Sequence, residues 1–97
     1  MKLVLIAYGA GLEPEVAELV RSAGAAGFTR WERAVGSGRS GGPHLDNPVW
    51  PDFNHVTAVV ADEATAGRVM AGVRDLRMKE GTRGVKAFML PVDEITA

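Results

Sequence analysis

The stretch KLVLIAYGAGLEPEVAELVRSAG, residues 2–24, joins an apolar segment to an amphipathic one through a short glycine-containing turn. Residues 2–8 are an unbroken apolar run after one lysine, which predicts a central β-strand. From residue 13 onward apolar side chains recur at helical spacing, Pro14 suits a first helical turn, and Gly24 suits a helix C-terminus. The stretch therefore predicts a strand followed by a helix of about three turns.

A second strand and helix follow later in the chain. Residues 55–61 resume a β-branched run, and Asp62 is placed to cap a helix N-terminus. The apolar stripe of this helix is Ala66, Val69, Met70, Val73 and Leu76. Gly67 and Gly72 each cost the helix about 1 kcal/mol relative to alanine, which predicts close packing on the sheet at these positions. We expect a turn at residues 79–84 after it.

Two further strands complete the predicted fold. Residues 28–35 mix aromatic, β-branched and charged side chains, which favours an edge strand, and residues 85–90 form a last apolar strand that Pro91 ends. The order β-α-β-β-α-β consists of two split βαβ units, which right-handed crossovers fold into an antiparallel sheet with both helices on one face. We therefore expect a single α+β domain over residues 1–97 with the ferredoxin-like βαββαβ architecture.

Both faces of this sheet are predicted to be apolar. The first strand puts Leu3 and Leu5 on one face and Val4 on the other, and the strands at residues 55–61 and 85–90 show the same two-sided pattern. Two helices cover only one face, although a free face in water normally carries polar residues. At about 25 cal/mol per Å², a wet aliphatic face costs many kcal/mol. We therefore expect an obligate homo-oligomer; the alternative is that a few exposed valines are harmless.

Composition excludes several classes of protein. The 97 residues contain no cysteine, which rules out disulfides, thiolate metal sites and cysteine nucleophiles. With 11 basic and 12 acidic residues the net charge is -1, so we expect no nucleic-acid partner. The longest apolar run is too short to cross a bilayer and the N-terminus lacks a signal-peptide pattern. We expect no direct membrane insertion and a cytoplasmic location.

A long loop separates the two middle strands. Residues 36–53 are rich in glycine, proline and serine. Loops longer than about 12–15 residues are uncommon in compact domains unless they are functional or mobile, so this loop is the first place to look for activity. Trp50 within it is a candidate anchor for a partner protein; the alternative is that its ring pins the loop to the body of the protein.

Histidines and carboxylates around this loop make a candidate metal site. His44 lies two residues before Asp46, and His55 follows the loop. A carboxylate ligates a metal directly or orients a ligating imidazole, so this set, together with Glu32 on the edge strand, suits zinc or copper. The spacing is not specific, and the alternative is that these side chains order the loop or are solvated. Symmetry in an oligomer would multiply the ligands that each chain contributes.

The order of elements, the glycine-rich loop and the segment EGTRGVKAFMLPVDE, residues 80–94, resemble the PII-like signalling proteins. The similarity spans nearly the whole chain, and the GPHL segment at residues 42–45 resembles a divergent branch of that family. The resemblance implies a homotrimer of ferredoxin-like subunits whose sheets face inward. It also implies that residues 36–53 are the extended T-loop, which contacts partner enzymes or membrane transporters.

The resemblance further implies a ligand site between subunits. In the family, a short glycine-rich loop before the last strand helps to hold ATP or ADP, a lysine enters that strand, and a Gly-x-Gly-Arg motif forms the base of the T-loop. Lys86 matches this lysine, and Gly36, Gly38 and Arg39 match the motif at the base of the T-loop. Gly84, also expected at the site, stands where the family has an acidic residue. Val85 stands where the family has a glycine, and we expect its β-branched side chain to hinder close approach of a phosphate.

These observations together predict a non-enzymatic PII-like regulator. We expect it to bind a small ligand, such as an adenine nucleotide, an anion or a metal, in the subunit cleft and to engage a partner through its long loop. An alternative is a divalent-metal sensor similar to the CutA-like proteins, which share this architecture. A small ferredoxin-fold enzyme is a third alternative, although no nucleophile elbow, spaced carboxylate pair or GKS/GKT phosphate loop supports it.

Overall fold

The computed structural model describes residues 1–34, 55–80 and 84–97. In chain order their elements are β1 (Lys2–Tyr8), η1 (Ala10–Leu12), α1 (Glu13–Ser22), β2 (Thr29–Glu32), β3 (His55–Ala61), α2 (Glu63–Glu80) and β4 (Val85–Pro91). The bounds predicted for β1 and β3 are confirmed, and β2 is a shorter edge strand than expected. Within these ranges no helix combines the length and the apolar composition needed to cross a bilayer.

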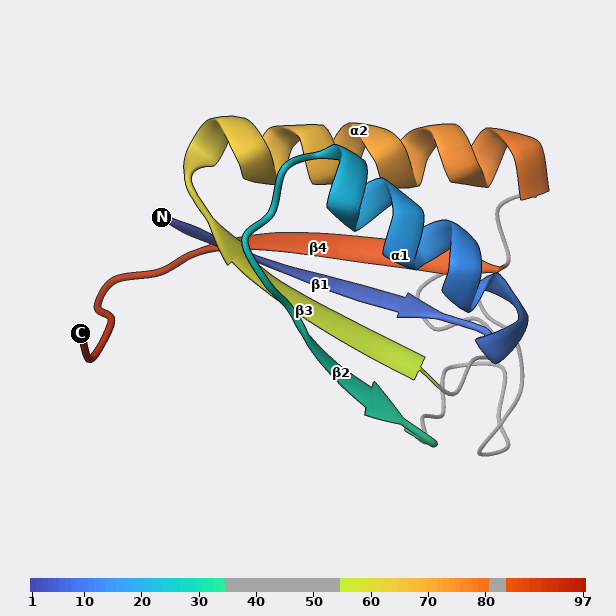
Figure 1. Ribbon diagram of the computed structural model, residues 1–97, viewed down its shortest axis with the longest axis horizontal. Coiled ribbons are helices and arrows are strands. Elements are labelled where there is room, and N and C mark those ends of the chain that lie inside the picture. Colours follow the sequence, from blue (N-terminus) through green and yellow to red (C-terminus); the bar gives the residue numbers. More distant parts are fainter. Residues whose placement is uncertain (35–54, 81–83) are drawn as a thin grey trace.

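The strands form one antiparallel sheet in the order β2-β3-β1-β4. Strand β1 is one of the two central strands, and Leu5, for example, lies between Ala58 of β3 and Phe88 of β4. Both helices lie on the same side of the sheet, so that helices and sheet form two layers (Figure 1). This is the ferredoxin-like βαββαβ fold that the order of elements predicts.

Local signals account for the ends of both helices. Pro14 lies in the first turn of α1, where its missing N–H costs no helical hydrogen bond. After α1, Gly24 adopts a φ of 88°, a left-handed conformation that other residues rarely adopt. At the start of α2, the Asp62 carboxylate accepts a hydrogen bond of 2.7 Å from the Thr65 N–H. This contact confirms Asp62 as the N-cap.

The core lies between the helices and the sheet. Its largest fully buried side chains come from both layers and are Tyr8, Ile6, Val4, Val16, Val59, Val69 and Val85. The stripe predicted for α2 is confirmed, because Ala66, Val69, Val73 and Leu76 are buried and Met70 packs against them. Burying each valine or isoleucine side chain stabilises the fold by about 1.5–3 kcal/mol, so this layer contact is the main source of stability.

Two expectations about α2 are corrected. A Cβ built on Gly72 would lie 3.2 Å from the Leu19 Cβ, so this glycine permits close packing, but on α1 and not on the sheet. A Cβ built on Gly67 would meet nothing within 4 Å, so the predicted close packing is wrong there. The expectation of a turn from residue 79 is wrong at its start, because α2 continues through Glu80; residues 81–83 lie outside the described residues.

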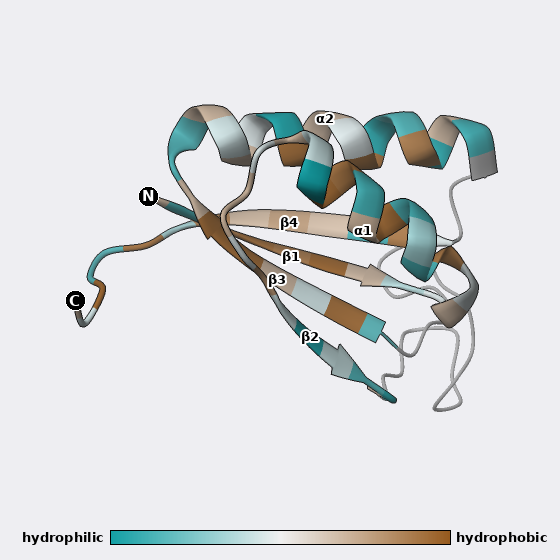
Figure 2. Ribbon diagram, viewed as in Figure 1, coloured by the Kyte–Doolittle hydropathy of each residue, from teal (hydrophilic) through white to brown (hydrophobic). Residues whose placement is uncertain are grey.

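The sheet face turned away from the helices carries large apolar side chains. Trp31, Val60 and Leu90 are 52%, 47% and 42% exposed, and both α-helices lie on the other face. Figure 2 shows hydrophobic residues along β1 and β4. A hollow of about 300 Å³ also opens here, lined by Gly27, Phe28, Thr29, Ala58 and Val60. An exposed apolar surface of this kind is typical of an interaction site. The homo-oligomer stays a prediction, and this sheet face is the surface through which we expect it to form.

Candidate functional site

Four of the predicted site residues lie within the described ranges: Glu32, His55, Gly84 and Lys86. The others, Gly36, Gly38, Arg39, His44, Asp46 and Trp50, lie outside the described residues. The four that are described gather at one end of the sheet. Glu32 pairs with His55, His55 pairs with Tyr8, and Tyr8 pairs with Val85, which stands between Gly84 and Lys86.

Gly84 lies where β4 begins, beside the end of β1. Its carbonyl oxygen accepts a hydrogen bond of 3.2 Å from the Gly9 N–H. A Cβ built on Gly84 would lie 2.9 Å from Cδ1 of Leu12, so any larger residue would force Leu12 to move. Cδ1 is the flexible end of the leucine side chain, so this shift would cost little. The hydrogen bond to Gly9 holds the backbone of Gly84 against the turn that follows β1.

The Val85 side chain points into the core and is fully buried. Its carbonyl oxygen accepts a hydrogen bond of 2.6 Å from Nη1 of Arg77, which ties the start of β4 to α2. Because the side chain is enclosed by the core, it offers no surface to an approaching ligand. The expectation that Val85 hinders a phosphate is therefore wrong on steric grounds.

Lys86 projects from the opposite face of the sheet, since successive strand residues point to opposite sides. It shares one row across the sheet with its register partner Ala7 and, beyond it, Val56 and Trp31. Neighbouring strands lie about 4.8 Å apart, so the backbones of Lys86 and Trp31 are roughly 15 Å apart. The row places a primary amine and a large aromatic ring on the sheet face that the helices leave uncovered. An amine in this position can pair with phosphate or carboxylate oxygens.

Glu32 and His55 lie opposite each other on the helix side of the sheet, at its β2 edge. The His55 ring contacts the Tyr8 ring, with centroids 5.6 Å apart and planes at 49°. Oε2 of Glu32 lies 3.4 Å from Nη2 of Arg30. No group of three or more His, Asp or Glu side chains suited to a metal ion occurs in the part of the chain that the structure describes. The described residues therefore supply one imidazole and one carboxylate to the predicted metal set.

A polar cluster beside these residues was not predicted. The hydroxyl of the buried Tyr8 donates a hydrogen bond of 2.5 Å to Oε1 of Glu13 and lies 2.8 Å from the Thr57 hydroxyl oxygen. The other Glu13 oxygen accepts a hydrogen bond of 3.0 Å from Nη1 of Arg30. Burial, together with the hydrogen bond to Glu13, raises the pKa of Tyr8 to about 12. The cluster joins β1, α1, β2 and β3 next to the strand ends that flank residues 35–54.

The signal for this cluster in the sequence was Tyr8 itself. A tyrosine that ends an aliphatic strand needs a hydrogen-bond partner for its hydroxyl once it is buried. Thr57, a polar residue inside the β-branched run of β3, was the second signal. Each residue by itself predicts only a position in a strand, because their pairing depends on a register that the sequence does not show.

Comparison with known sequences identifies the family of this chain. A sequence model described as nitrogen regulatory protein P-II matches residues 1–97. The chain belongs to the nitrogen regulatory protein P-II family. Proteins of this family are non-enzymatic signalling proteins, so the chain is a PII-like signalling protein and not an enzyme. No curated protein matches the chain.

Solved structures of PII-like proteins share the fold. A PII-like signalling protein from Thermus thermophilus is 25% identical, with a TM-score of 0.68 over 94% of this chain and 84% of that one. CPII from Thiomonas intermedia, bound to ADP and bicarbonate, is 22% identical, with a TM-score of 0.65 over 96% and 88%. The structure of CPII bound to ADP, AMP and bicarbonate is 18% identical, with a TM-score of 0.62 over 97% of this chain and 93% of that one. These similarities confirm the PII-like fold.

Proposed function

We propose that this PII-like protein binds an adenine nucleotide in a cleft between the subunits of a homotrimer. In this proposal Gly84 and Lys86 contact the phosphates, and Gly36, Gly38 and Arg39 complete the site from the base of the long loop. The occupied site changes how residues 36–53 engage a partner, either an enzyme or a membrane transporter. The observation that carries the proposal is the start of β4, where a close-packed glycine precedes an outward-facing lysine.

Three features of this strand start support a phosphate site. Gly84 has no side chain to project toward a ligand, and its carbonyl oxygen is held by the Gly9 N–H. The Val85 side chain is removed into the core, and Arg77 holds its carbonyl oxygen. Lys86 then supplies the positive charge that phosphate oxygens require. CPII, which shares this fold, has been solved with ADP and with AMP.

Calorimetric titration with ADP and AMP, with and without bicarbonate, tests this proposal. We expect saturable binding by the full chain and a loss of about tenfold or more in affinity for Lys86→Ala, because a charge-assisted hydrogen bond contributes about 1.5–3 kcal/mol. Lys2→Ala is the matched control. It removes the same charge at the opposite end of the sheet from Lys86, which pairs with Ala7, and should leave affinity unchanged. Absence of any nucleotide binding, or equal losses in the two variants, would contradict the proposal.

The homotrimer is tested separately by sedimentation. We expect the native chain to sediment as a trimer and Val60→Glu to dissociate it, since Val60 lies on the uncovered sheet face and is 47% exposed. Met78→Glu places the same charge on α2, where Met78 is 86% exposed, and should leave the trimer intact. A native chain that stays monomeric at micromolar concentration is incompatible with this assembly.

A second candidate, a divalent-metal site, rests on the pairing of Glu32 with His55 across β2 and β3. In this proposal His44 and Asp46 complete the ligand set for zinc or copper. Calorimetric titration of the full chain with each metal tests it. We expect a saturable heat that His44→Ala or His55→Ala reduces strongly; no heat, or identical heat from both variants and the native chain, excludes these histidines as ligands.

A further inference from the structure

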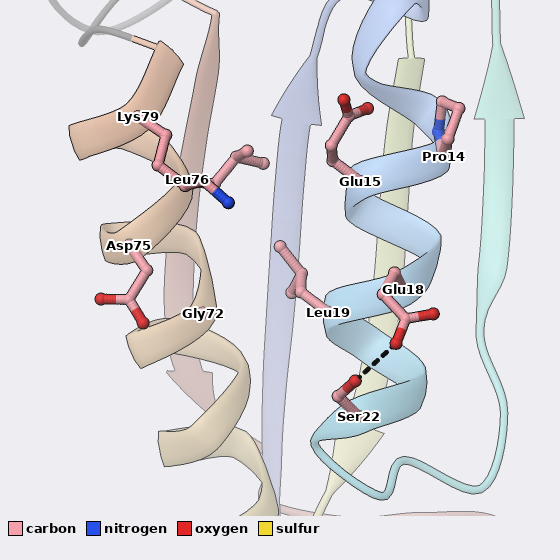
Figure 3. Close-up of a pocket in the computed structure, with 9 residues that line it drawn as sticks. All are labelled: Pro14, Glu15, Glu18, Leu19, Ser22, Gly72, Asp75, Leu76 and Lys79. Carbon is pink, nitrogen blue, oxygen red and sulfur yellow. Dashed lines mark hydrogen bonds between the residues drawn. The ribbon is translucent and has the colours of Figure 1, made fainter.

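A groove of about 500 Å³ runs between α1 and α2 on the outer side of the helix layer. It lies on the face opposite to Lys86 and to the uncovered sheet face. Figure 3 shows Leu19 of α1 and Leu76 of α2 pointing into the space between the helices. The residues that line it are Pro14, Glu15, Glu18, Leu19, Ser22, Gly72, Asp75, Leu76 and Lys79.

Gly72 of α2 lines the groove where it lies against Leu19 of α1. A Cβ at this position would lie 3.2 Å from the Leu19 Cβ and 3.4 Å from its Cδ1. The missing side chain therefore lets the helices approach and leaves Leu19 half-buried, available to an incoming apolar group. An apolar floor of this kind gains free energy when a partner side chain covers it.

Carboxylates flank the apolar floor on both helices. Glu15 lies on α1 and Asp75 lies on α2, and neither takes part in an ion pair among the described residues. Glu18, also at the rim, is paired with Arg21 at 2.5 Å and accepts a hydrogen bond from Ser22. Lys79 is the one cation that lines the groove among the residues that the structure describes.

We propose that this groove is a docking site for a basic amphipathic segment of a partner protein. Its apolar side chain would cover the half-buried Leu19, beside Leu76, which is only 6% exposed, and its lysines or arginines would face Glu15 and Asp75. The acidic rim, set on both sides of an apolar floor, is complementary to this pattern of charge.

Two other occupants fit less well. The chain's own C-terminal tail is acidic, since it carries Asp93 and Glu94, so the groove carboxylates repel it. The uncovered sheet face of a second copy carries aliphatic side chains and Trp31, with Lys86 as its one lysine among the described residues, so it does not match a rim with carboxylates on two sides. Docking here is independent of the nucleotide site, because the groove lies on the other side of the sheet.

A fluorescent peptide built only of leucine and lysine, arranged as an amphipathic helix, tests the proposal by anisotropy. We expect saturable binding that weakens as salt rises, and weaker binding of a matched peptide in which glutamate replaces every lysine. Glu15→Gln with Asp75→Asn should weaken the basic peptide about fivefold, since each exposed charge pair contributes about 0.2–1 kcal/mol. Asp93→Asn with Glu94→Gln makes the same change of charge on the exposed tail and should leave affinity unchanged.

Two readouts locate the peptide. Gly72→Ala should weaken binding, because the new methyl group displaces Leu19, whereas Gly67→Ala adds a methyl group in open space and should not. Amide chemical shifts should change at residues 15–22 and 72–79 on peptide addition. Equal effects of the two charge-neutralising pairs, equal affinity for both peptides, or shifts confined to the sheet would overturn the proposal. Shifts in the groove that depend on protein concentration without peptide would identify a second copy as the occupant and would also overturn it.

Discussion

The guanidinium of Arg30 on β2 donates a hydrogen bond of 3.0 Å to the Glu13 carboxylate at the start of α1. The other oxygen of that carboxylate accepts the hydrogen bond from the buried Tyr8. One carboxylate thus joins the edge strand to the centre of the sheet, and the edge strand leads directly into residues 35–54. A movement of β2 caused by a ligand or a partner would therefore have to strain or break the contact between Arg30 and Glu13.

The hydroxyl of Tyr8 is expected to stabilise the fold. Tyr8→Phe removes its hydrogen bonds to Glu13 and Thr57 and leaves the buried Thr57 hydroxyl without this partner. We expect a loss of about 1–3 kcal/mol in the free energy of unfolding, measured by urea denaturation with circular dichroism. An unchanged unfolding midpoint would show that the cluster adds nothing to stability.

The stability of the protein should fall at high pH because of the same residue. Tyr8 has a pKa of about 12 in the folded chain, against 10.0 for a free tyrosine. Between these values the unfolded chain releases the phenol proton while the folded chain keeps it, so stability falls as pH rises from 10 to 12. The loss is on the order of 2 kcal/mol, and Tyr8→Phe should remove it. Tyr8 is the single tyrosine, so the phenolate absorbance reports its titration directly.

The N-cap of α2 should give an opposite pH dependence. The hydrogen bond from the Thr65 backbone N–H, followed by that from its side chain, lowers the pKa of Asp62. The contribution of the Asp62 carboxylate to stability is fully present above the ordinary carboxyl pKa, and it is lost as pH falls through the lowered pKa of the folded chain. Asp62→Ala should reduce stability near neutral pH, and Asp62→Asn should reduce it by less. Thermal melts at neutral and acidic pH check this, and equal losses in the two variants would rule out the cap.

The two glycines of α2 should respond differently to the same substitution. Gly67→Ala adds a methyl group in open space and should stabilise the helix by about 0.5–1 kcal/mol. Gly72→Ala forces the new methyl group against Leu19, so the gain should vanish or turn into a loss. The melting temperatures of the two variants, compared with that of the native chain, test this difference in stability. Equal stabilisation of both would mean that the two helices are not closely packed.

Val85 should be a core residue and not an obstacle to the ligand. Val85→Gly restores the glycine found at this position in the family but removes a fully buried side chain. We expect a loss of about 2–4 kcal/mol in stability and no gain in nucleotide affinity, checked by denaturation and calorimetry together. If Val85→Gly kept native stability and bound nucleotide more tightly, Val85 would be an obstacle at the ligand site after all.

The strands and helices could be predicted from the sequence because their signals are local. The apolar runs of β1 and β3, the N-cap Asp62 and the left-handed Gly24 each involve residues close together in the chain. The two-sided apolar character of β1 also follows from its own alternation of side chains. The resemblance carried by residues 80–94 then pointed to the PII family without any knowledge of contacts.

Only the tertiary structure decided which side chains meet. The pairing of Glu32 with His55, the burial of Val85 beside Tyr8, and the row from Lys86 to Trp31 all depend on strand register, which joins residues far apart in the chain. The hydrogen bonds of Tyr8 to Glu13 and Thr57 and the contact of Gly72 with Leu19 depend in addition on how the helices lie on the sheet. A local sequence pattern records which face a residue occupies, but the neighbours on that face come from distant segments brought together by packing.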